Sequence, residues 1–487
     1  MCFLENLHSA IKVGLKNRNI PISDRVKTLT DDDLKKLEYF TILNLWIGLE
    51  GISGFFRSCG FEDLTSEEIQ GWVLCCINLG FLRTEVESDK AFFLPEDEVY
   101  VYFARELSSQ DILECHVASD KFFISWLADT AADLEIDLPE AKDLQRKLLI
   151  GPNGVLDLLA HSPQFQGTFL GSIKLAVSWQ EHLFQIKKYE EASDIVNMIC
   201  FAIARQGERT FAESLLVRCI SATKGISNLV SRINLATLLR EDANLKPALR
   251  LYRGTILGLL KNKAYQQLAM VFSEIGVIHS HNGHLLRAAF TLEICSMLHG
   301  ALRNGKSQAI AQSQLANVYR YVGLYGLALR ASTLACIYFR AHTDYLNLGR
   351  ALLTCGNIYY NLKLTDQALE CFDESSSIGK MISDSQSMCG ASSGKARVLM
   401  MMNDLDNAKQ ILDEVISIRQ RNSDHSIGVE YQNMGYLYEL KGNLAMAIVW
   451  YNKALKNFRQ YMPVEVTPCE LRIQIVQRQL THINNKK

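Results

Sequence analysis

The sequence predicts an all-α fold, an α-α superhelix of paired helices that follows a small N-terminal α+β module. Three observations support this prediction. Proline, which breaks helices, occurs only 8 times in 487 residues. The second half of the chain repeats with a period close to 40 residues. One segment near the N-terminus has the pattern of a strand hairpin, and no other segment has a convincing one.

The N-terminal module begins with three expected helices, at residues 34–49, 55–59 and 66–79. Thr65 and Glu68 have the spacing of a capping box at the start of the third helix, and Gly80 ends that helix. Apolar segments at 81–84 and 91–94 flank polar residues and predict a β-hairpin. Three helices and a hairpin predict a winged-helix-like module over residues 1–105.

The charge of the third helix argues against DNA binding. A helix in the major groove needs donors for phosphates and base edges. Residues 67–78 contain two acids, Glu67 and Glu68, and no base. The whole chain has Lys+Arg 51 and Asp+Glu 53, so no global basic field attracts a phosphate backbone either. We therefore expect no nucleic-acid partner, and a DNA-bound regulator is the weakest alternative.

Two columns of small residues define six repeat units over residues 225–460. The first column lies on the first helix of each unit and the second lies twelve residues later on its second helix. Small residues permit close helix crossing, and large residues nearby fill the adjacent gaps. The columns are Ala236, Gly276, Ala316, Gly356, Ala396 and Gly435, followed by Ala248, Ala288, Ala328, Ala368, Ala408 and Ala447.

The remaining segments complete the expected order of the chain. Residues 106–167 are expected to form a helical connector, 168–224 degenerate repeats and 461–487 a capping helix that starts with Thr467 as cap and Pro468 in its first turn. Within the units, a tight turn in the left-handed conformation makes the two helices antiparallel. The residues expected in that turn are Gly283, Gly323, Asn403 and Gly442.

The array resembles the tetratricopeptide repeat family. The last unit matches that family's pattern of Leu-Gly, Tyr, Gly, Ala, Phe/Tyr and Ala through Met434-Gly435, Tyr438, Gly442, Ala447, Tyr451 and Ala454. A period of 40 instead of about 34 implies longer helices, similar to the long-repeat subgroup of cargo and polarity adaptors. The resemblance implies a non-catalytic scaffold or adaptor whose concave groove binds a peptide or helix of a partner protein.

The N-terminal module, followed by a helical bundle around residues 96–133 and then by repeats, resembles the sensor half of STAND-type signalling ATPases. This resemblance implies an alternative function, as the sensor-regulatory tail of a signalling ATPase or cyclase. The roughly 30 residues before the module are too few for a Rossmann-like nucleotide core. The chain is therefore expected to be a fragment, a degenerate relative or a different winged-helix scaffold.

In such solenoids, the residues one and four positions after the first small residue point into the groove. Asparagine can hydrogen-bond the backbone of an extended peptide, and arginine can bind a carboxylate through two parallel hydrogen bonds. We therefore expect a protein partner that carries an acidic residue; the alternative is a concave face that contacts only solvent. The expected groove residues are Asn317, Arg320, Asn357, Tyr360, Arg397, Arg240 and Tyr436, with Met400 and Glu439 at equivalent positions.

Two motifs suggest other chemistry. Residues 300–307 match the phosphate-binding loop pattern, but that loop needs a preceding strand, and here a helix is expected. We interpret the segment as an inter-repeat turn with Ser307 as helix cap. His279, His281 and His284 lie close in sequence but straddle the turn at Gly283, and His279 occupies a core column. No metal, cofactor or catalytic residue is expected, and the protein is predicted not to be an enzyme.

The composition favours the cytoplasm. The 13 cysteines are odd in number and scattered, as expected of reduced core thiols. Residues 1–20 have no signal-peptide pattern, and no segment reaches the ~18 uninterrupted apolar residues that a bilayer requires. We expect a soluble intracellular protein without membrane insertion. The identity of the partner, the pathway and the oligomeric state do not follow from the sequence.

Overall fold

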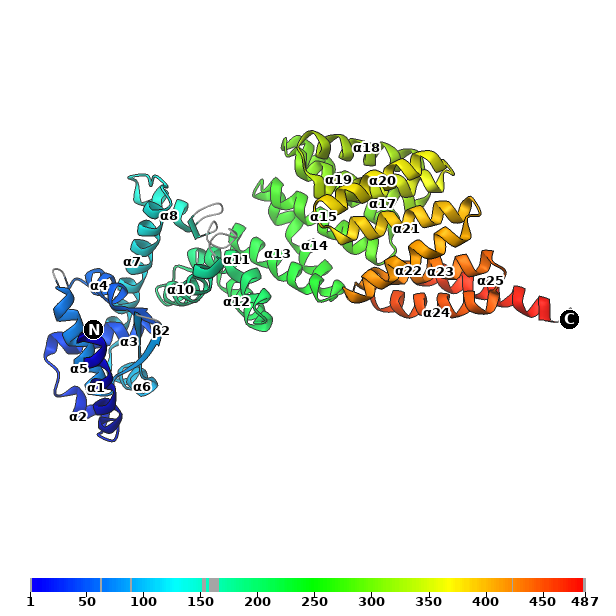
Figure 1. Cartoon of the computed structure of the whole chain (residues 1–487). Coiled ribbons are helices and arrows are strands. Elements are labelled where there is room, and N and C mark those ends of the chain that lie inside the picture. Colours follow the sequence, from blue (N-terminus) through cyan, green and yellow to red (C-terminus); the bar gives the residue numbers. More distant parts are fainter. Residues whose placement is uncertain are drawn as a thin grey trace. The chain divides into compact units, whose positions relative to one another are not determined.

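The computed structural model describes residues 2–61, 64–87, 90–150, 155–156, 166–422 and 424–484, and these are mostly helical (Figure 1). The chain divides into two compact units, Met1–Leu238 and Leu239–Lys487. The all-α expectation is confirmed, and so is the small α+β region near the N-terminus. Among the helices in these residue ranges, none is long and apolar enough to cross a membrane. The finer segment boundaries given above stay predictions.

The N-terminal module contains a three-stranded antiparallel sheet in the order β1-β3-β2. The predicted hairpin is confirmed, with Arg83 opposite Leu94. The helix expected over 34–49 ends earlier, because Asn44 adopts a left-handed conformation with φ 44° and a two-residue strand follows. The elements are α1 (Cys2–Asn17), α2 (Ile22–Val26), α3 (Asp31–Leu43), β1 (Ile47–Gly48), α4 (Leu49–Ser58), α5 (Ser66–Asn78), β2 (Leu82–Glu87), β3 (Lys90–Pro95) and α6 (Asp97–Glu106).

Both ends of α5 are satisfied by specific hydrogen bonds. At its start, Thr65 accepts from the backbone N–H of Glu68 and Glu68 accepts from the backbone N–H of Thr65, so the predicted capping box is confirmed. At its end, the Arg25 guanidinium of α2 donates to the carbonyl of Leu79 at 2.9 Å. The last carbonyls of a helix lack partners within the helix, and α2 supplies one here.

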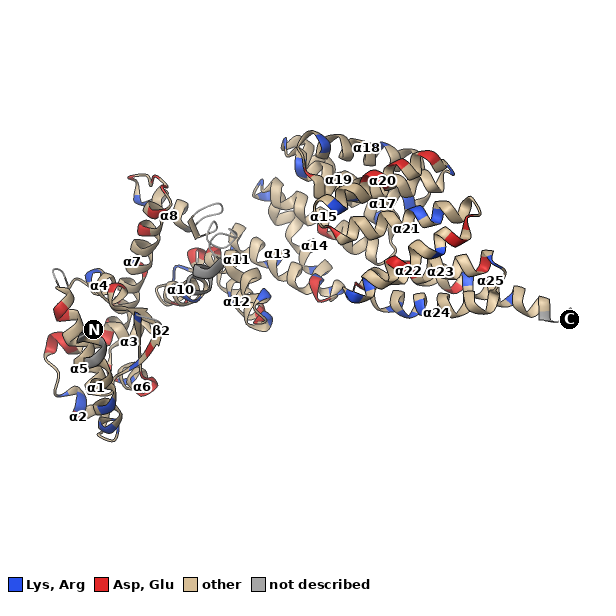
Figure 2. Ribbon diagram, viewed as in Figure 1, with Lys and Arg blue, Asp and Glu red and all other residues tan. Residues whose placement is uncertain are grey.

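Helix α1 was not predicted from the sequence. It packs on α5, and Gly14 permits the contact, because a Cβ at this position would lie 2.0 Å from the carbonyl oxygen of Ile77. The expected third helix of the module therefore has a helix packed against it as well as two acids in its first turn. Basic and acidic residues are interspersed along the helices of the chain (Figure 2).

The rest of the first unit is helical and is held together by a buried carboxylate. Asp120 accepts hydrogen bonds from Arg146, Trp179 and Lys188, and so links three helices and the start of a fourth. Burial alone would raise the pKa of Asp120, but the hydrogen bonds from Arg146 and Lys188 lower it overall. The helices are α7 (Ser109–Asp133), α8 (Lys142–Ile150), α10 (Gln166–Gln185), α11 (Tyr189–Arg205), α12 (Arg209–Ala222) and α13 (Gly225–Glu241), near whose end the two units divide.

The second unit is a stack of antiparallel helix pairs, coloured from green to red in Figure 1. The 40-residue period is confirmed, because four consecutive first helices begin at residues 265, 305, 345 and 385. The helices are α14 (Leu245–Lys261), α15 (Tyr265–His281), α16 (Leu285–Ala301), α17 (Gly305–Val322), α18 (Tyr325–Ala341), α19 (Tyr345–Asn361), α20 (Thr365–Met381), α21 (Ser385–Met401), α22 (Leu405–Arg421), α23 (Gly428–Leu440) and α24 (Leu444–Tyr461).

The two small columns lie at the closest helix contacts. All six alanines of the second column are completely buried. In the first column, a Cβ added at Gly276 would lie 2.7 Å from Leu292, and one added at Gly435 would lie 2.7 Å from Tyr451. In each pair the large residue comes from the second helix of the same unit. The register derived from the sequence is confirmed.

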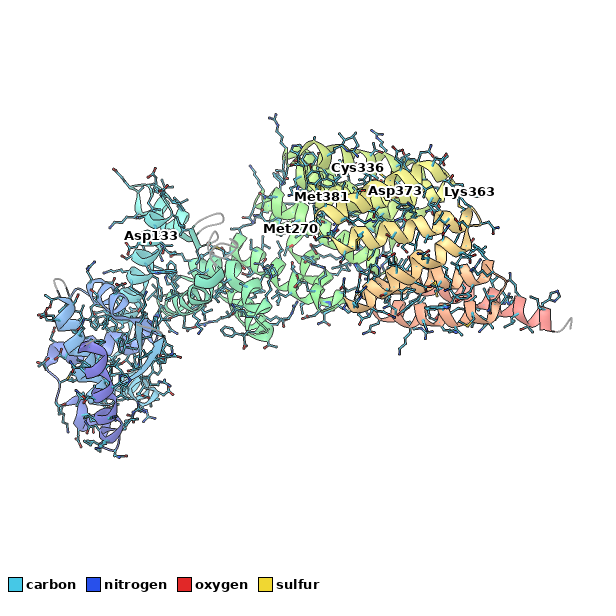
Figure 3. The ribbon with its side chains drawn as sticks, in the orientation of Figure 1. Asp133, Met270, Cys336, Lys363, Asp373 and Met381 are labelled. Atoms are coloured by element: carbon cyan, nitrogen blue, oxygen red, sulfur yellow. The ribbon has the colours of Figure 1, made fainter. Side chains whose placement is uncertain are left out.

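The turns within the units have the predicted left-handed conformation. Gly283, Gly323, Asn403 and Gly442 all have positive φ, between 64° and 88°. The equivalent residue in another unit is Lys363, labelled in Figure 3, which adopts φ 62° although it is not glycine. The turn geometry therefore persists where the favoured residue is absent, because the packed helices on either side determine it.

The end of the array differs slightly from the prediction. The 3-10 turn η3 (Pro463–Glu465) joins α24 to α25 (Val466–Asn484). Thr467 and Pro468 lie inside the first turn of α25, so Thr467 is not its cap. Cys469 and Val476 of α25 are buried in a core cluster that also contains residues of α24, as a capping helix requires.

The described cysteines are free thiols, and most are buried. Cys336, labelled in Figure 3, lies in the core cluster formed by α17, α18, α19 and α20, with its sulfur 3.9 Å from that of Cys355. Burial raises the pKa of Cys200 and Cys371 to about 12, so their thiols stay protonated near neutral pH. They behave as small apolar core residues, as the sequence indicates.

Candidate partner-binding face

The candidate site lies on the first-helix face, which we define as the surface formed by the adjacent first helices α17, α19, α21 and α23. Each of these packs beside the next. Residues at equivalent positions in successive repeats are therefore neighbours. Two hydrogen bonds between residues 40 positions apart show this register: Asn433 Nδ2 donates to Ser393 Oγ at 3.0 Å, and Arg397 Nη2 donates to Asn357 Oδ1.

Arg397 brings three of the predicted residues together. Besides its hydrogen bond to Asn357, its guanidinium carbon lies 4.6 Å from the centroid of the Tyr360 ring. Such cation–π contacts contribute about 0.5 to 2 kcal/mol, depending on burial. Burial lowers the pKa of Arg397, Tyr360 opposes that change, and the positive charge of Arg320 lowers the pKa further.

Arg320 lies on α17 beside Asn317 and Tyr321. Its guanidinium carbon is 4.1 Å from the centroid of the Tyr321 ring, and its Nε and Nη2 atoms are each 3.4 Å from Asn317 Oδ1. The amide of Asn317 in turn lies 3.5 Å from the hydroxyl of Thr354 on α19. These are long, weak hydrogen bonds. In the described part of the chain, neither Arg320 nor Arg397 forms a salt bridge with a carboxylate.

The other predicted residues are engaged by the chain itself. Arg240 forms an ion pair with Glu274 at 2.6 Å. The Tyr436 ring has the Arg472 guanidinium of α25 at 5.7 Å from its centroid. Met400, expected to face the groove, is only 3% exposed and lies in a core cluster with residues of α22 and α23. The structure therefore corrects the position of Met400, because packing against the following helices outweighs its nominal inward register.

Sequence reasoning missed two residues beside this cluster, Tyr321 and Glu465. Tyr321 follows Arg320 directly and is 39% exposed. Burial raises the pKa of Tyr321, Arg320 opposes that change, and Glu465 raises the pKa further through its charge and a hydrogen bond. The position next to a predicted groove residue is a local signal for Tyr321. No local signal exists for Glu465, which lies several repeats away in the sequence.

The segment that matches a phosphate-binding loop is a turn between two helices, as predicted. α16 precedes it, and Arg303 within it has φ 55°. The predicted cap, Ser307, was wrong by three residues: Asn304 caps α17 by accepting a hydrogen bond from the backbone N–H of Ser307 at 3.1 Å. The Lys306 ammonium forms an ion pair with Asp344 at 3.2 Å, across the next inter-repeat turn.

The three histidines near residue 280 do not form a ligand set, although the rings of His279 and His284 meet edge to face with centroids 5.8 Å apart. His279 is 3% exposed, and its Nε2 lies 3.3 Å from a guanidinium nitrogen of Arg253, whereas His281 and His284 are exposed. The expectation that His279 is a core residue is confirmed. Among the described residues, no group of three or more His, Cys, Asp or Glu side chains is placed to hold a metal ion.

Residues 431–461 match the family model described as tetratricopeptide repeat. This segment contains α24 and most of α23, which form the last helix pair of the array. No curated protein matches the chain. Among solved structures, similarity extends over much larger parts of the chain at low sequence identity.

Three of these structures have been solved from named prokaryotes. A STAND signal-transduction ATPase with a tetratricopeptide repeat sensor, from Pyrococcus horikoshii, is 15% identical with a TM-score of 0.48, over 92% of this chain and 66% of that one. This chain therefore spans slightly less than two thirds of that protein. A tetratricopeptide repeat protein from Parabacteroides merdae is 15% identical with a TM-score of 0.44, over 58% and 98%. The quorum sensor NprR from B. thuringiensis is 14% identical with a TM-score of 0.45, over 66% and 96%.

The family match and the structure of the second unit agree on the repeat. The matched pair α23 and α24 has the same small columns, buried alanine and glycine turn as the units before it. Similar helix pairs recur about every 40 residues through the preceding part of the array. Residues 431–461 therefore match a tetratricopeptide repeat, and the other helix pairs of the second unit have the same architecture.

Proposed function

We propose that the chain is a non-catalytic scaffold or adaptor that binds a carboxylate-bearing segment of a partner protein on the first-helix face. Tetratricopeptide repeats generally mediate contacts between proteins, which supports a protein partner. The partner segment is an extended peptide or a helix, and the binding reaction involves no cofactor. The cytoplasm is the proposed location, because the described cysteines are free thiols.

The observation that carries this proposal is the pair Arg320 and Arg397. The two guanidinium groups are close enough that Arg320 lowers the pKa of Arg397, and neither has a salt bridge to a carboxylate in the described part of the chain. Two like charges held together at a partly buried site repel each other. An anionic side chain between them would relieve that repulsion and accept charge-assisted hydrogen bonds.

The neutral neighbours favour a peptide over a small anion. Asn357 and Asn317 present amide groups along the same face, where they can bond a peptide backbone. Tyr360 and Tyr321 offer flat apolar surface beside the charges. An extended segment with one acidic residue uses all of these groups together.

The test is affinity purification with the full chain and with the double variant Arg320→Glu, Arg397→Gln. Glutamine at position 397 retains an amide donor for Asn357 and removes the charge, so the fold should survive. Proteins bound by the wild type should bind the double variant at least tenfold less tightly, since losing one partner of a desolvated charge pair costs about 2 to 5 kcal/mol. Arg330→Gln, at an exposed position on α18, is the matched control. Unchanged binding by a double variant with a normal melting curve would contradict the proposal.

A second function is supported by the order of elements in the N-terminal module. Helix α3, strand β1, helices α4 and α5, and the β2–β3 hairpin follow one another as in a winged helix, and helices α6 and α7 come next. This order fits the sensor-regulatory tail of a signalling ATPase or cyclase. An antibody raised against the repeat array would then detect, in native extracts, an ATP-binding or cyclase protein heavier than 55.0 kDa. Detection of a 55 kDa species alone would contradict this second candidate.

A further inference from the structure

The turn η3, at the end of the array, contacts a helix near the beginning of the array. It joins α24 to α25 and packs on both, and it also lies against α15. Helix α15 belongs to the second of the six units, whereas η3 follows the last one. The small rotation between successive repeats accumulates along a solenoid. Over these units it is large enough to bring residues 463–465 back to an early first helix.

Glu465 of this turn reaches the arginine and tyrosine cluster of the first-helix face. Its carboxylate acts on the hydroxyl of Tyr321 and raises the pKa of that group. Arg320 also contacts this tyrosine, because its guanidinium carbon lies 4.1 Å from the centroid of the Tyr321 ring. Glu465 is half-buried and forms no salt bridge among the described residues. A carboxylate of the chain itself therefore sits beside the groups that lack one.

We propose that the Met462–Val466 segment is a built-in ligand of the first-helix face, with Glu465 in the position of the partner's carboxylate. This inference rests on the proposed function of that face. It also specifies the partner chemistry: a glutamate or aspartate carried on a short apolar turn, like the Pro463-Val464-Glu465 sequence here. A partner of this kind competes with the chain's own segment for Tyr321 and Arg320.

The contact is built to be reversible. Glu465 acts on Tyr321, and the charge of Glu430, which acts on Arg397, is already paired with Arg419 at 3.2 Å. A partner carboxylate that engages both Arg320 and Arg397 therefore has more to gain. Because the segment is tethered at both ends by α24 and α25, its effective concentration at the face is high. Partner affinity is thereby reduced by the fraction of molecules in which the segment is docked.

The first measurement is hydrogen exchange on the full chain with Glu465→Gln. This substitution removes the charge and keeps the size of the side chain. We expect faster exchange in α15 and in residues 461–467, while α20 and α22 stay as protected as before. Glu470→Gln is the matched control, because Glu470 pairs with Arg459 at 2.8 Å and not with the cluster. Unchanged exchange in Glu465→Gln, or the same change in Glu470→Gln, would overturn the proposal.

The second measurement uses a probe of known sequence. A fluorescent peptide of residues 459–470, with serine in place of Cys469, is titrated into the wild type and into Glu465→Gln. The variant should bind this peptide at least tenfold more tightly than the wild type, and the gain should vanish when the peptide's glutamate at position 465 is also replaced by glutamine. Equal binding of the peptide by both proteins would overturn the proposal that the chain's own segment occupies the first-helix face.

The two proposals fail in different ways. If Glu465→Gln accelerates exchange and admits the peptide, but Arg320→Glu with Arg397→Gln leaves natural partners bound, the internal contact stands and the proposed function fails. If the arginine substitutions abolish partner binding while Glu465→Gln neither changes exchange nor strengthens that binding, the proposed function stands and the internal ligand fails.

Discussion

The ring of Phe372 on α20 lies directly against the backbone of Gly356 on α19, so closely that a Cβ at Gly356 would be 2.5 Å from ring atom Cε1. The ring cannot retreat easily, because a Cβ at Gly394 on α21 would lie 2.4 Å from the same atom. Phe372 itself is 1% exposed. One aromatic side chain thus fills the space left by glycines in two consecutive first helices.

Gly356→Ala should therefore destabilise the second unit. The added methyl group overlaps a ring that has glycine backbone on its other side, and overpacking of this kind costs roughly 1 to 3 kcal/mol. A urea denaturation curve measures the change in the free energy of unfolding. Gly254→Ala is the control, because a Cβ there meets nothing within 4 Å and helix propensity favours alanine by about 0.5 to 1 kcal/mol. Destabilisation of equal size in both variants would show that the predicted close packing does not determine the effect.

Lys306→Ala should leave the chain without measurable nucleotide affinity, as in the wild type, because the segment around it is an inter-repeat turn. The side chain of Lys306 is 63% exposed, and its ion pair with Asp344 is a surface contact. We expect a change in unfolding free energy within about 0.5 kcal/mol. Titration calorimetry with ATP and Mg²⁺ checks the binding. Heat of specific binding in the wild type that disappears in Lys306→Ala would refute the interpretation.

Thr65→Ala should destabilise the N-terminal module. The substitution removes the side-chain oxygen that accepts from the backbone N–H of Glu68, and loss of such a cap costs about 1 kcal/mol. Ser66→Ala, at the next position, is exposed and has no capping role, so it should change the free energy of unfolding little. Thermal melts followed by hydrogen exchange in α5 compare the two. Equal effects would mean that the capping box contributes nothing specific.

Asp194 on α11 should make the first unit less stable at neutral pH than at mildly acidic pH. Burial raises the pKa of Asp194 to about 6, the hydrogen bond from Ser227 partly opposes this, and the neighbouring acids Glu190 and Glu191 raise it further. The ordinary value is 3.8, so between that value and about 6 the folded state binds more protons than the unfolded state. The contribution of Asp194 to stability is therefore lost as the pH rises through this window.

Asp194→Asn provides the matching measurement. Asparagine keeps the shape and an oxygen that can accept from Ser227, but it does not ionise. The variant should exceed the wild type in unfolding free energy at pH 7 by on the order of 1 kcal/mol, a value discounted for partial solvent exposure. The difference should shrink to nothing as the pH falls below about 4. A difference that stays constant with pH would contradict the raised pKa.

Much of the second unit could be predicted from the sequence, because its contacts repeat. Gly276, Gly356 and Gly435 recur in one column since each faces a large residue on the next helix, and both partners lie within one unit. Local packing of this kind leaves a periodic trace. Strand β1 left none, because two residues show no alternation. Helix α1 was missed because nothing in its own residues reveals that Gly14 would meet α5.

The contacts between adjacent repeats at the candidate site could be predicted from the sequence, and the approach of Glu465 from the end of the array could not. Asn357 and Arg397 follow from the register, since one repeat period separates them and their side chains meet. Met400 holds an inward register position yet packs in the core, because the following helices α22 and α23 cover it. Glu465 reaches Tyr321 only through curvature accumulated over several units, and no single repeat encodes that curvature.

The contact between Glu465 and Tyr321 also distinguishes two phases in the assembly of the second unit. Most contacts in the array join neighbouring helices, so each pair can form as soon as its own residues are available. This contact joins residues several units apart, so it requires every intervening helix-crossing angle to be in place. Its loop-closure entropy cost is not offset by other contacts until those units have formed. We therefore expect it to form late during folding and to open early under strain. A strained or incompletely folded repeat anywhere between α17 and α24 would release the segment, so the state of the first-helix face reports the integrity of the whole array.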